Sequence, residues 1–224
     1  MGAVLIAVLG AAGVAFALLS KGDLPEGVLV QDDFSEVAEH WSLDSYKGIT
    51  TAIEDGGYHV RLTRPDRSAH ESVAFDEGNE YENVRVSVTA RFESTADGAV
   101  VGLTCGYAPG DGESITGLFG RYQAEIGLDG KARILRILNA DEQVLEDVQA
   151  PVALDEQETN DLHMTCRYDG RVALVTLAVN GDRAVEAEDD DPFSSFESAG
   201  MYAATRGAGL EVLFDDLQAE EIDG

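Results

Sequence analysis

The chain has 224 residues and carries 15 basic against 43 acidic residues, which gives a formal net charge of −28 and an isoelectric point near 4.1. A field of this sign repels nucleic acid and anionic lipid, so neither is expected as a partner. Beyond its apolar first segment the sequence shows no Pro/Gly/Ser-rich linker and no long-period repeat, so one large β-sandwich fits its length. The acidity fits either simple solubility or adaptation to high salt.

Residues 2–19 form an apolar run without a charged residue. About 18 residues at ~1.5 Å each are just long enough to cross a bilayer as a helix. We therefore expect residues 1–20 to form a transmembrane or signal-anchor helix, joined by a linker over residues 21–27 to the rest of the chain. No basic residue precedes the run, as one would in a typical signal peptide, yet Ala15-Phe16-Ala17 has a small-x-small cleavage pattern. Retention and cleavage both stay open.

Small residues recur every four positions along the expected helix, at Ala3, Ala7, Ala11 and Ala15. Such a stripe lets helices approach closely in a membrane or a filament core. It predicts a membrane partner and a homo-oligomer through this helix, although the run is rich in alanine throughout.

The clearest strand pattern lies in residues 160–185. Leu162, Met164 and Cys166 alternate with polar residues, which is the period of a half-buried strand. Asp169-Gly170 and Asn180-Gly181 then read as tight turns. This segment predicts three consecutive antiparallel strands.

The same reasoning predicts strands over most of residues 28–221, with loops at 64–70 and 187–192. The expected strands are 28–34, 49–54, 58–63, 73–75, 84–92, 99–107, 119–128, 132–138, 143–148, 199–205 and 210–217. About a dozen short strands with regular turn signals indicate an all-β, two-sheet antiparallel sandwich.

The two cysteines, Cys105 and Cys166, both fall on the apolar phase of expected strands. Outside the cytoplasm a disulfide between them is plausible, and closing a loop of about 60 residues would stabilise the fold by about 4 kcal/mol in the chain-entropy model. The alternative is two separate buried thiols. A disulfide and the apolar leader both place the acidic domain outside the cytoplasm.

The order of these elements resembles the concanavalin A-like lectin/glucanase jelly rolls. The resemblance rests on several short segments and covers residues 28–221. The segments are Asp32-Asp33-Phe34 with Trp41, Asp55-Gly56-Gly57-Tyr58, residues 81–92, residues 122–130, Val179-Asn180-Gly181 and Val212-Leu213-Phe214-Asp215-Asp216. Within that superfamily the chain looks akin to bacterial extracytoplasmic domains of the 3-keto-disaccharide hydrolase-like family. The resemblance implies a jelly roll with one concave face that often binds glycans, and a structural Ca²⁺ near the paired chain ends.

Retaining glucanases of this fold carry catalytic carboxylates in a Glu-x-Asp-x-Glu pattern, because alternate residues of a strand share a face. That pattern is missing from the expected strands. Glu186, Glu188 and Asp190 have the period, but they lie beside the expected acidic loop. We therefore name no catalytic residue, and the sequence leans away from an enzyme.

Four carboxylates are the best candidates for a cation site: Asp32, Asp33, Asp215 and Asp216. If the first and last strands pair, these side chains converge, and hard oxygen ligands suit Ca²⁺. The alternative role is turn capping and solubility.

Sugar binding needs an exposed aromatic platform with polar neighbours, for which Trp41 and Tyr46 are the main candidates, unless they belong to the core. Arginines on the polar phases of expected strands could recognise an acidic glycan or pair with local carboxylates. Those arginines are Arg85, Arg91, Arg121 and Arg167.

These observations favour a non-catalytic β-sandwich outside the cytoplasm, anchored or secreted, that binds glycan or a surface polymer. A structural alternative is a subunit of a filament or surface layer that packs through its N-terminal helix. A third, suggested by the resemblance alone, is a glycoside-processing enzyme of the keto-sugar hydrolase type.

Overall fold

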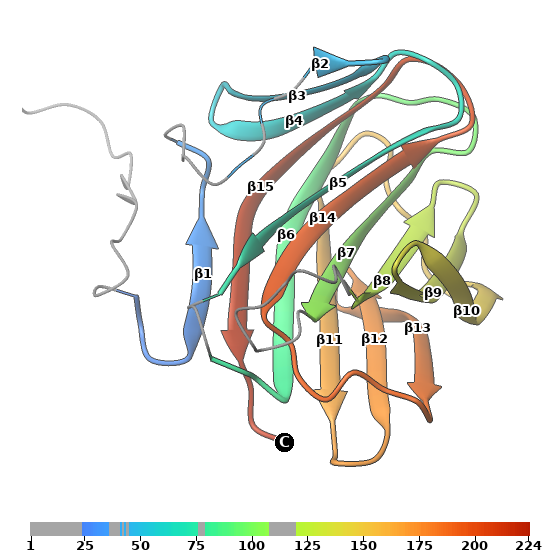
Figure 1. Cartoon of the computed structure of the whole chain (residues 1–224). Coiled ribbons are helices and arrows are strands. Elements are labelled where there is room, and N and C mark those ends of the chain that lie inside the picture. The colour runs from blue at the N-terminus through green and yellow to red at the C-terminus, as the bar shows by residue number, and fades with distance from the viewer. Residues whose placement is uncertain (1–23, 36–40, 42, 44, 76–78, 108–119) are drawn as a thin grey trace, which may run out of the picture.

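The protein is built from two antiparallel β-sheets that pack face to face, the smaller lying across the larger (Figure 1). The computed structural model describes residues 24–35, 41, 43, 45–75, 79–107 and 120–224. Every element in this part of the chain is a strand, which confirms the all-β expectation.

The larger sheet has nine strands in the order β13-β12-β11-β6-β15-β4-β3-β2, and β1 pairs with β15 beside this path. Its strands are β1 (Val28–Asp32), β2 (Ser45–Tyr46), β3 (Ile49–Glu54), β4 (Gly57–Leu62), β6 (Asn83–Ser94), β11 (Asn160–Tyr168), β12 (Ala173–Val179), β13 (Asp182–Asp189) and β15 (Leu210–Glu221).

The smaller sheet has six strands in the order β10-β9-β8-β7-β14-β5. They are β5 (Arg67–Ala74), β7 (Val100–Tyr107), β8 (Gly120–Gly127), β9 (Lys131–Leu138), β10 (Asp141–Gln149) and β14 (Ser198–Thr205). Each strand from β7 to β10 pairs antiparallel with the next strand in the chain, and tight turns join β8 to β9 and β9 to β10.

Alternation along the strands decides which side chains fill the space between the sheets. On β6, Val84, Val86 and Val88 are at most 2% exposed, whereas Arg85 and Arg91 point outward. The predicted disulfide between Cys105 and Cys166 is confirmed. Because β7 and β11 belong to different sheets, this disulfide ties the two layers together through the core.

The expected loop at 64–70 is partly wrong, since β5 begins at Arg67 and pairs along its whole length with β14. Its polar composition hid it, because His70 and its neighbours Ser68 and Ser72 face away from the core. The expected acidic loop at 187–192 is also shorter, because β13 continues to Asp189.

The helix expected over residues 1–20 lies outside the described residues, as do residues 21–23 of the expected linker. Among the residues that the structure does describe, no helix is long and apolar enough to span a bilayer.

Candidate functional site

The outer face of the six-stranded sheet is the best candidate for a functional surface, because it is built from polar side chains that are buried or half-buried. On β8, Tyr122, Ala124 and Ile126 belong to the core, so the alternate residues of that strand point away from it. The outward-facing positions of this sheet also hold the buried Leu135 and Ile137, and we call their polar neighbours the polar face. It consists of His70, Thr104, Arg121, Gln123, Glu125, Arg133 and Tyr202.

Three members of the polar face are almost inaccessible although they point away from the core: Thr104 is 1% exposed, and Gln123 and Glu125 are each 2% exposed. Buried polar groups persist in folded proteins when they are hydrogen-bonded. Gln123 Nε2 donates to Glu125 Oε2 at 2.8 Å, and Arg133 forms an ion pair with Glu125. His70 Nε2 and Thr104 Oγ1 form a hydrogen bond of 3.1 Å. The polar face therefore lies on five strands and contains two hydrogen-bonded groups, Gln123–Glu125–Arg133 and His70–Thr104.

Some hydrogen-bonding capacity on the polar face is left open. Within the described part of the chain, the buried Nε–H of Arg121 has no acceptor and the buried Oε1 of Gln123 has no donor. Burial lowers the pKa of Arg121, because the charged guanidinium loses solvation there. Because alternate residues of a strand share a face, this donor and this acceptor lie on the same side of the sheet.

Burial also shifts the pKa values of His70 and Tyr202 on this face. Burial, with a smaller contribution from the Arg121 guanidinium, lowers the pKa of His70 to about 4, so the ring is neutral at pH 7. Burial and the Glu125 carboxylate raise the pKa of Tyr202, while the neighbouring Ser68 and Gln123 act in the opposite direction. Near neutral pH, His70 and Tyr202 therefore both present uncharged, hydrogen-bonding groups.

Gly102 lies in the register between Tyr202 on β14 and Glu125 on β8. A Cβ at Gly102 would stand 2.3 Å from the backbone oxygen of Ala124 and 2.9 Å from Cα of Glu125. The glycine therefore allows the close strand approach that brings Tyr202 and Glu125 together.

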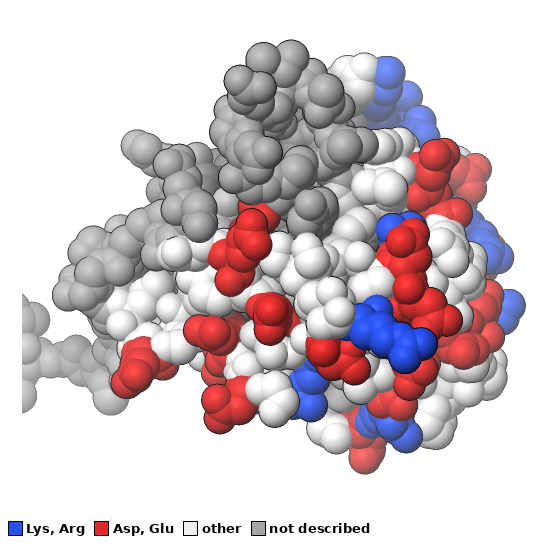
Figure 2. Space-filling model, turned by 60° about the horizontal axis from the view of Figure 1, so that its bottom comes forward, with Lys and Arg blue, Asp and Glu red and all other residues white. Residues whose placement is uncertain are grey.

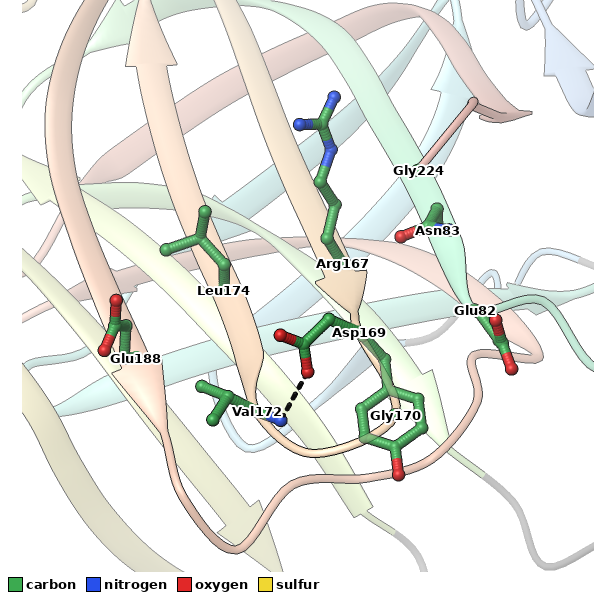
Figure 3. Close-up of a pocket in the computed structure, with 10 residues that line it drawn as sticks. Glu82, Asn83, Arg167, Asp169, Gly170, Val172, Leu174, Glu188 and Gly224 are labelled. Atoms are coloured by element: carbon green, nitrogen blue, oxygen red, sulfur yellow. Dashed lines mark hydrogen bonds between the residues drawn. The ribbon is translucent and has the colours of Figure 1, made fainter.

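A hollow of about 620 Å³ lies on the outer side of the nine-stranded sheet, where β11 turns into β12 (Figure 3). Arg167, Leu174 and Glu188 line it from three neighbouring strands, and Asn83 faces it from β6. In Figure 3 the Asp169 carboxylate accepts the backbone N–H of Val172 and so closes the turn at its edge. The lining mixes one cation with carboxylates and apolar groups, and nothing in its contacts selects a ligand class.

The structure separates the arginines that were considered together. Arg121 lies on the polar face, whereas Arg85, Arg91 and Arg167 point outward from the nine-stranded sheet. Arg85 pairs with Glu220 at 2.8 Å and Arg91 with Glu93 at 2.5 Å, so these two already have local carboxylate partners. Arg121 is the one of these four arginines that lies on the six-stranded sheet, and it remains the candidate for ligand recognition there.

The aromatic candidates also separate. Trp41 is 4% exposed and packs against Phe34 and Tyr58, and its Nε1 donates to Asp32 Oδ2 at 2.6 Å. Its ring belongs to the core and offers no exposed platform. Tyr46 is 58% exposed on the edge strand β2, away from the polar face, with the Lys47 ammonium 4.6 Å from its ring centre.

The four aspartates suggested as a Ca²⁺ site do lie near one another, because β1 pairs with β15 as the hypothesis required. Burial raises the pKa of Asp215, and the nearby Asp216, Asp33 and Asp32 carboxylates add to that shift. Asp32, however, accepts the N–H of Phe34 at 2.8 Å and Asp33 accepts that of Ser35 at 3.1 Å, which is turn capping. Ca²⁺ binding here stays a prediction.

No protein-family model matches the chain, and no curated protein matches it by sequence. Solved structures match it along most of its length. A Bacillus subtilis protein of unknown function with a galectin-like fold has a TM-score of 0.60 at 11% identity, covering 87% of this chain and 96% of its own. A Bacillus licheniformis β-glucanase has a TM-score of 0.56 at 13% identity, covering 88% and 99%. The Bacillus subtilis carbohydrate-binding module CBM66 has a TM-score of 0.52 at 11% identity, covering 81% and 95%.

The fold is a concanavalin A-like jelly roll. At these identities the likeness shows the architecture alone. The finer resemblance to the 3-keto-disaccharide hydrolase-like domain stays a prediction.

Sequence reasoning named Arg121 but missed most of the polar face. A signal for part of it was present in Arg121-Tyr122-Gln123-Ala124-Glu125, where polar residues alternate with core residues on one strand. His70 and Tyr202 could not have been added in this way, because only the pairing of β5 with β14 brings them opposite each other.

Proposed function

We propose that this jelly roll is a glycan-binding module that acts outside the cytoplasm and binds its ligand on the polar face. The observation that carries the proposal is a buried donor on Arg121 beside a buried acceptor on Gln123, neither of which has a partner among the described residues, next to side chains that hydrogen bonds hold at Glu125 and His70. A preorganised face of this kind loses little side-chain conformational entropy when it binds hydroxyl groups.

The names of the structural neighbours support the same proposal. They include a carbohydrate-binding module, the carbohydrate recognition domain of Emp46p and a galectin-like protein. The disulfide supports a location outside the cytoplasm, since disulfides persist in oxidising compartments. Anchoring through residues 1–20, and assembly through their alanine stripe, remain further proposals about a segment outside the described residues.

A hydrolytic role is the second candidate, because β-glucanases are also among the structural neighbours. Two-carboxylate hydrolysis needs an acid and a second carboxylate on neighbouring positions of one face. Of the three outward residues on β8, only Glu125 is a carboxylate, and it is engaged by Gln123 and Arg133. This arrangement favours binding over cleavage.

The test is binding of the full-length protein to an array of neutral and acidic glycans. We expect Arg121→Ala to weaken binding at least tenfold, because a hydrogen bond to a charged donor contributes about 1.5–3 kcal/mol. Arg167→Ala is the matched control, since it removes an arginine from the other sheet.

Three results would reject the proposal as stated. They are no binding to any glycan, loss of binding in Arg167→Ala with Arg121→Ala intact, or release of new reducing ends from a bound glycan. The second would move the site to the hollow of Figure 3, and the third would favour the hydrolase.

A further inference from the structure

Two carboxylates and one imidazole meet on the outer face of the nine-stranded sheet, on three adjacent strands. Glu54 ends β3, His59 lies on β4 and Glu211 lies on β15. One ligand atom from each lies within 4.8 Å of the others. His59 Nδ1 is 3.4 Å from Glu211 Oε1 and 3.9 Å from Glu54 Oε1. We call these three residues the carboxylate–histidine cluster.

His59 is the unusual member of this cluster. It is 7% exposed, and neither of its ring nitrogens has a hydrogen-bond partner in the part of the chain that the structure describes. A buried polar group left without a partner costs about 1–3 kcal/mol, so this arrangement asks for an explanation. Its Nδ1 lies near two carboxylate oxygens but not in hydrogen-bond geometry with either.

The spacing of the three ligand atoms suits a metal ion. Zinc binds histidine nitrogen and carboxylate oxygen at about 2.0–2.2 Å in a tetrahedron, which places neighbouring ligand atoms about 3.4 Å apart. The two measured distances from Nδ1 to the carboxylate oxygens, 3.4 Å and 3.9 Å, are close to this spacing. We propose that Glu54, His59 and Glu211 bind a Zn²⁺ ion, with water as the fourth ligand.

Arg61 is the competitor for this site. Its Nε donates to Glu211 Oε1 at 2.7 Å, and its Nη2 contacts Glu54 Oε1. Its side chain is 32% exposed, so it can turn outward or move to the second oxygens of the same carboxylates. The two carboxylates carry one more unit of negative charge than the single guanidinium neutralises. The net charge of −28 also attracts cations to the whole surface.

Zinc titration of the full-length protein by calorimetry tests the proposal, with excess Mg²⁺ present to occupy weak surface carboxylates. We expect one Zn²⁺ per chain. His59→Gln should weaken binding at least tenfold, whereas the matched control His163→Gln, which changes a half-buried histidine on β11, should leave it unchanged. Arg61→Met should tighten binding several-fold, because it removes the competing cation.

Co²⁺ serves as a spectroscopic probe of the same site. Bound in a tetrahedral site it should give intense visible absorption that disappears in His59→Gln, with Glu211→Gln as the second variant if His59→Gln does not fold. The proposal is overturned if the wild-type protein binds no stoichiometric Zn²⁺, if loss of His59 and loss of Glu211 both leave affinity unchanged, or if Arg61→Met weakens binding. Glycan binding on the opposite sheet is measured separately, so either proposal can fail alone.

Discussion

At the scale of the residue, the pKa of His70 is lowered because its side chain is buried in the polar face. Burial and the Arg121 guanidinium lower its pKa to about 4 from an ordinary value of 6.5. The unfolded chain therefore binds a proton at His70 between these two pH values while the folded protein does not. Its contribution to stability is present above pH 6.5 and is lost as the pH falls towards 4.

This shift predicts acid sensitivity that can be assigned to one residue. Between pH 7 and pH 4.5 the free energy of unfolding should fall, with about 2 kcal/mol of the loss due to His70 after allowance for partial solvent exposure. His70→Gln retains a partner for Thr104 but does not titrate, so its loss over the same interval should be smaller. Urea unfolding at both pH values measures the difference. Equal losses in the two proteins would show that His70 titrates normally in the fold.

At the scale of the element, the disulfide links a strand of one sheet to a strand of the other. Cys105 on β7 and Cys166 on β11 are both fully buried, and their residue numbers differ by 61. Replacing both with alanine should lower the free energy of unfolding by about 4 kcal/mol in the chain-entropy model. Denaturation of the double variant beside the oxidised wild-type protein checks this. A loss under about 1 kcal/mol would mean that the unfolded chain is already restricted in other ways.

Local chemistry made most elements predictable. The two hairpins at 160–189 were expected from Asp169-Gly170 and Asn180-Gly181, and in the structure Asn180 and Gly181 both have positive φ, at 53° and 86°. That is the backbone that Asn-Gly turns favour. β5 was half missed because its strand pattern depends on a partner more than 120 residues away.

The same limit applies to the candidate sites. Arg121 is visible in the sequence as the polar phase of a strand. The carboxylate–histidine cluster is not visible, because Glu211 reaches Glu54 and His59 only through the pairing of β15 with β4. Trp41 was considered for a ligand platform, since composition alone does not tell a buried indole from an exposed one.

At the scale of the whole molecule, the surface is dominated by one sign of charge. Acidic side chains spread over the face shown in Figure 2, and the basic side chains there lie among them. Within the described residues, six arginines form ion pairs with carboxylates: Arg61, Arg85, Arg91, Arg133, Arg136 and Arg183. Many of the 15 basic residues are thus already paired with neighbouring carboxylates. The 43 acidic side chains far outnumber the basic ones, so most of them repel one another through solvent.

This excess charge predicts that salt stabilises the fold. Repulsion between exposed carboxylates acts over about 10 Å at 0.1 M salt and over about 3 Å at 1 M, so raising NaCl from 0.05 to 2 M should raise the melting temperature. Each kcal/mol gained corresponds to about 2–4 °C for a chain of this size.

A charge-reduced variant separates screening from other effects of salt. Glu156, Glu158 and Asp223 are exposed. Changing all three to lysine should raise the melting temperature at low salt and flatten its dependence on NaCl, because less repulsion remains to be screened. If wild type and variant respond to NaCl with the same slope, the acidity serves solubility and does not adapt the fold to salt. If the slopes differ as expected, the acidity makes the stability of the jelly roll depend on a saline environment.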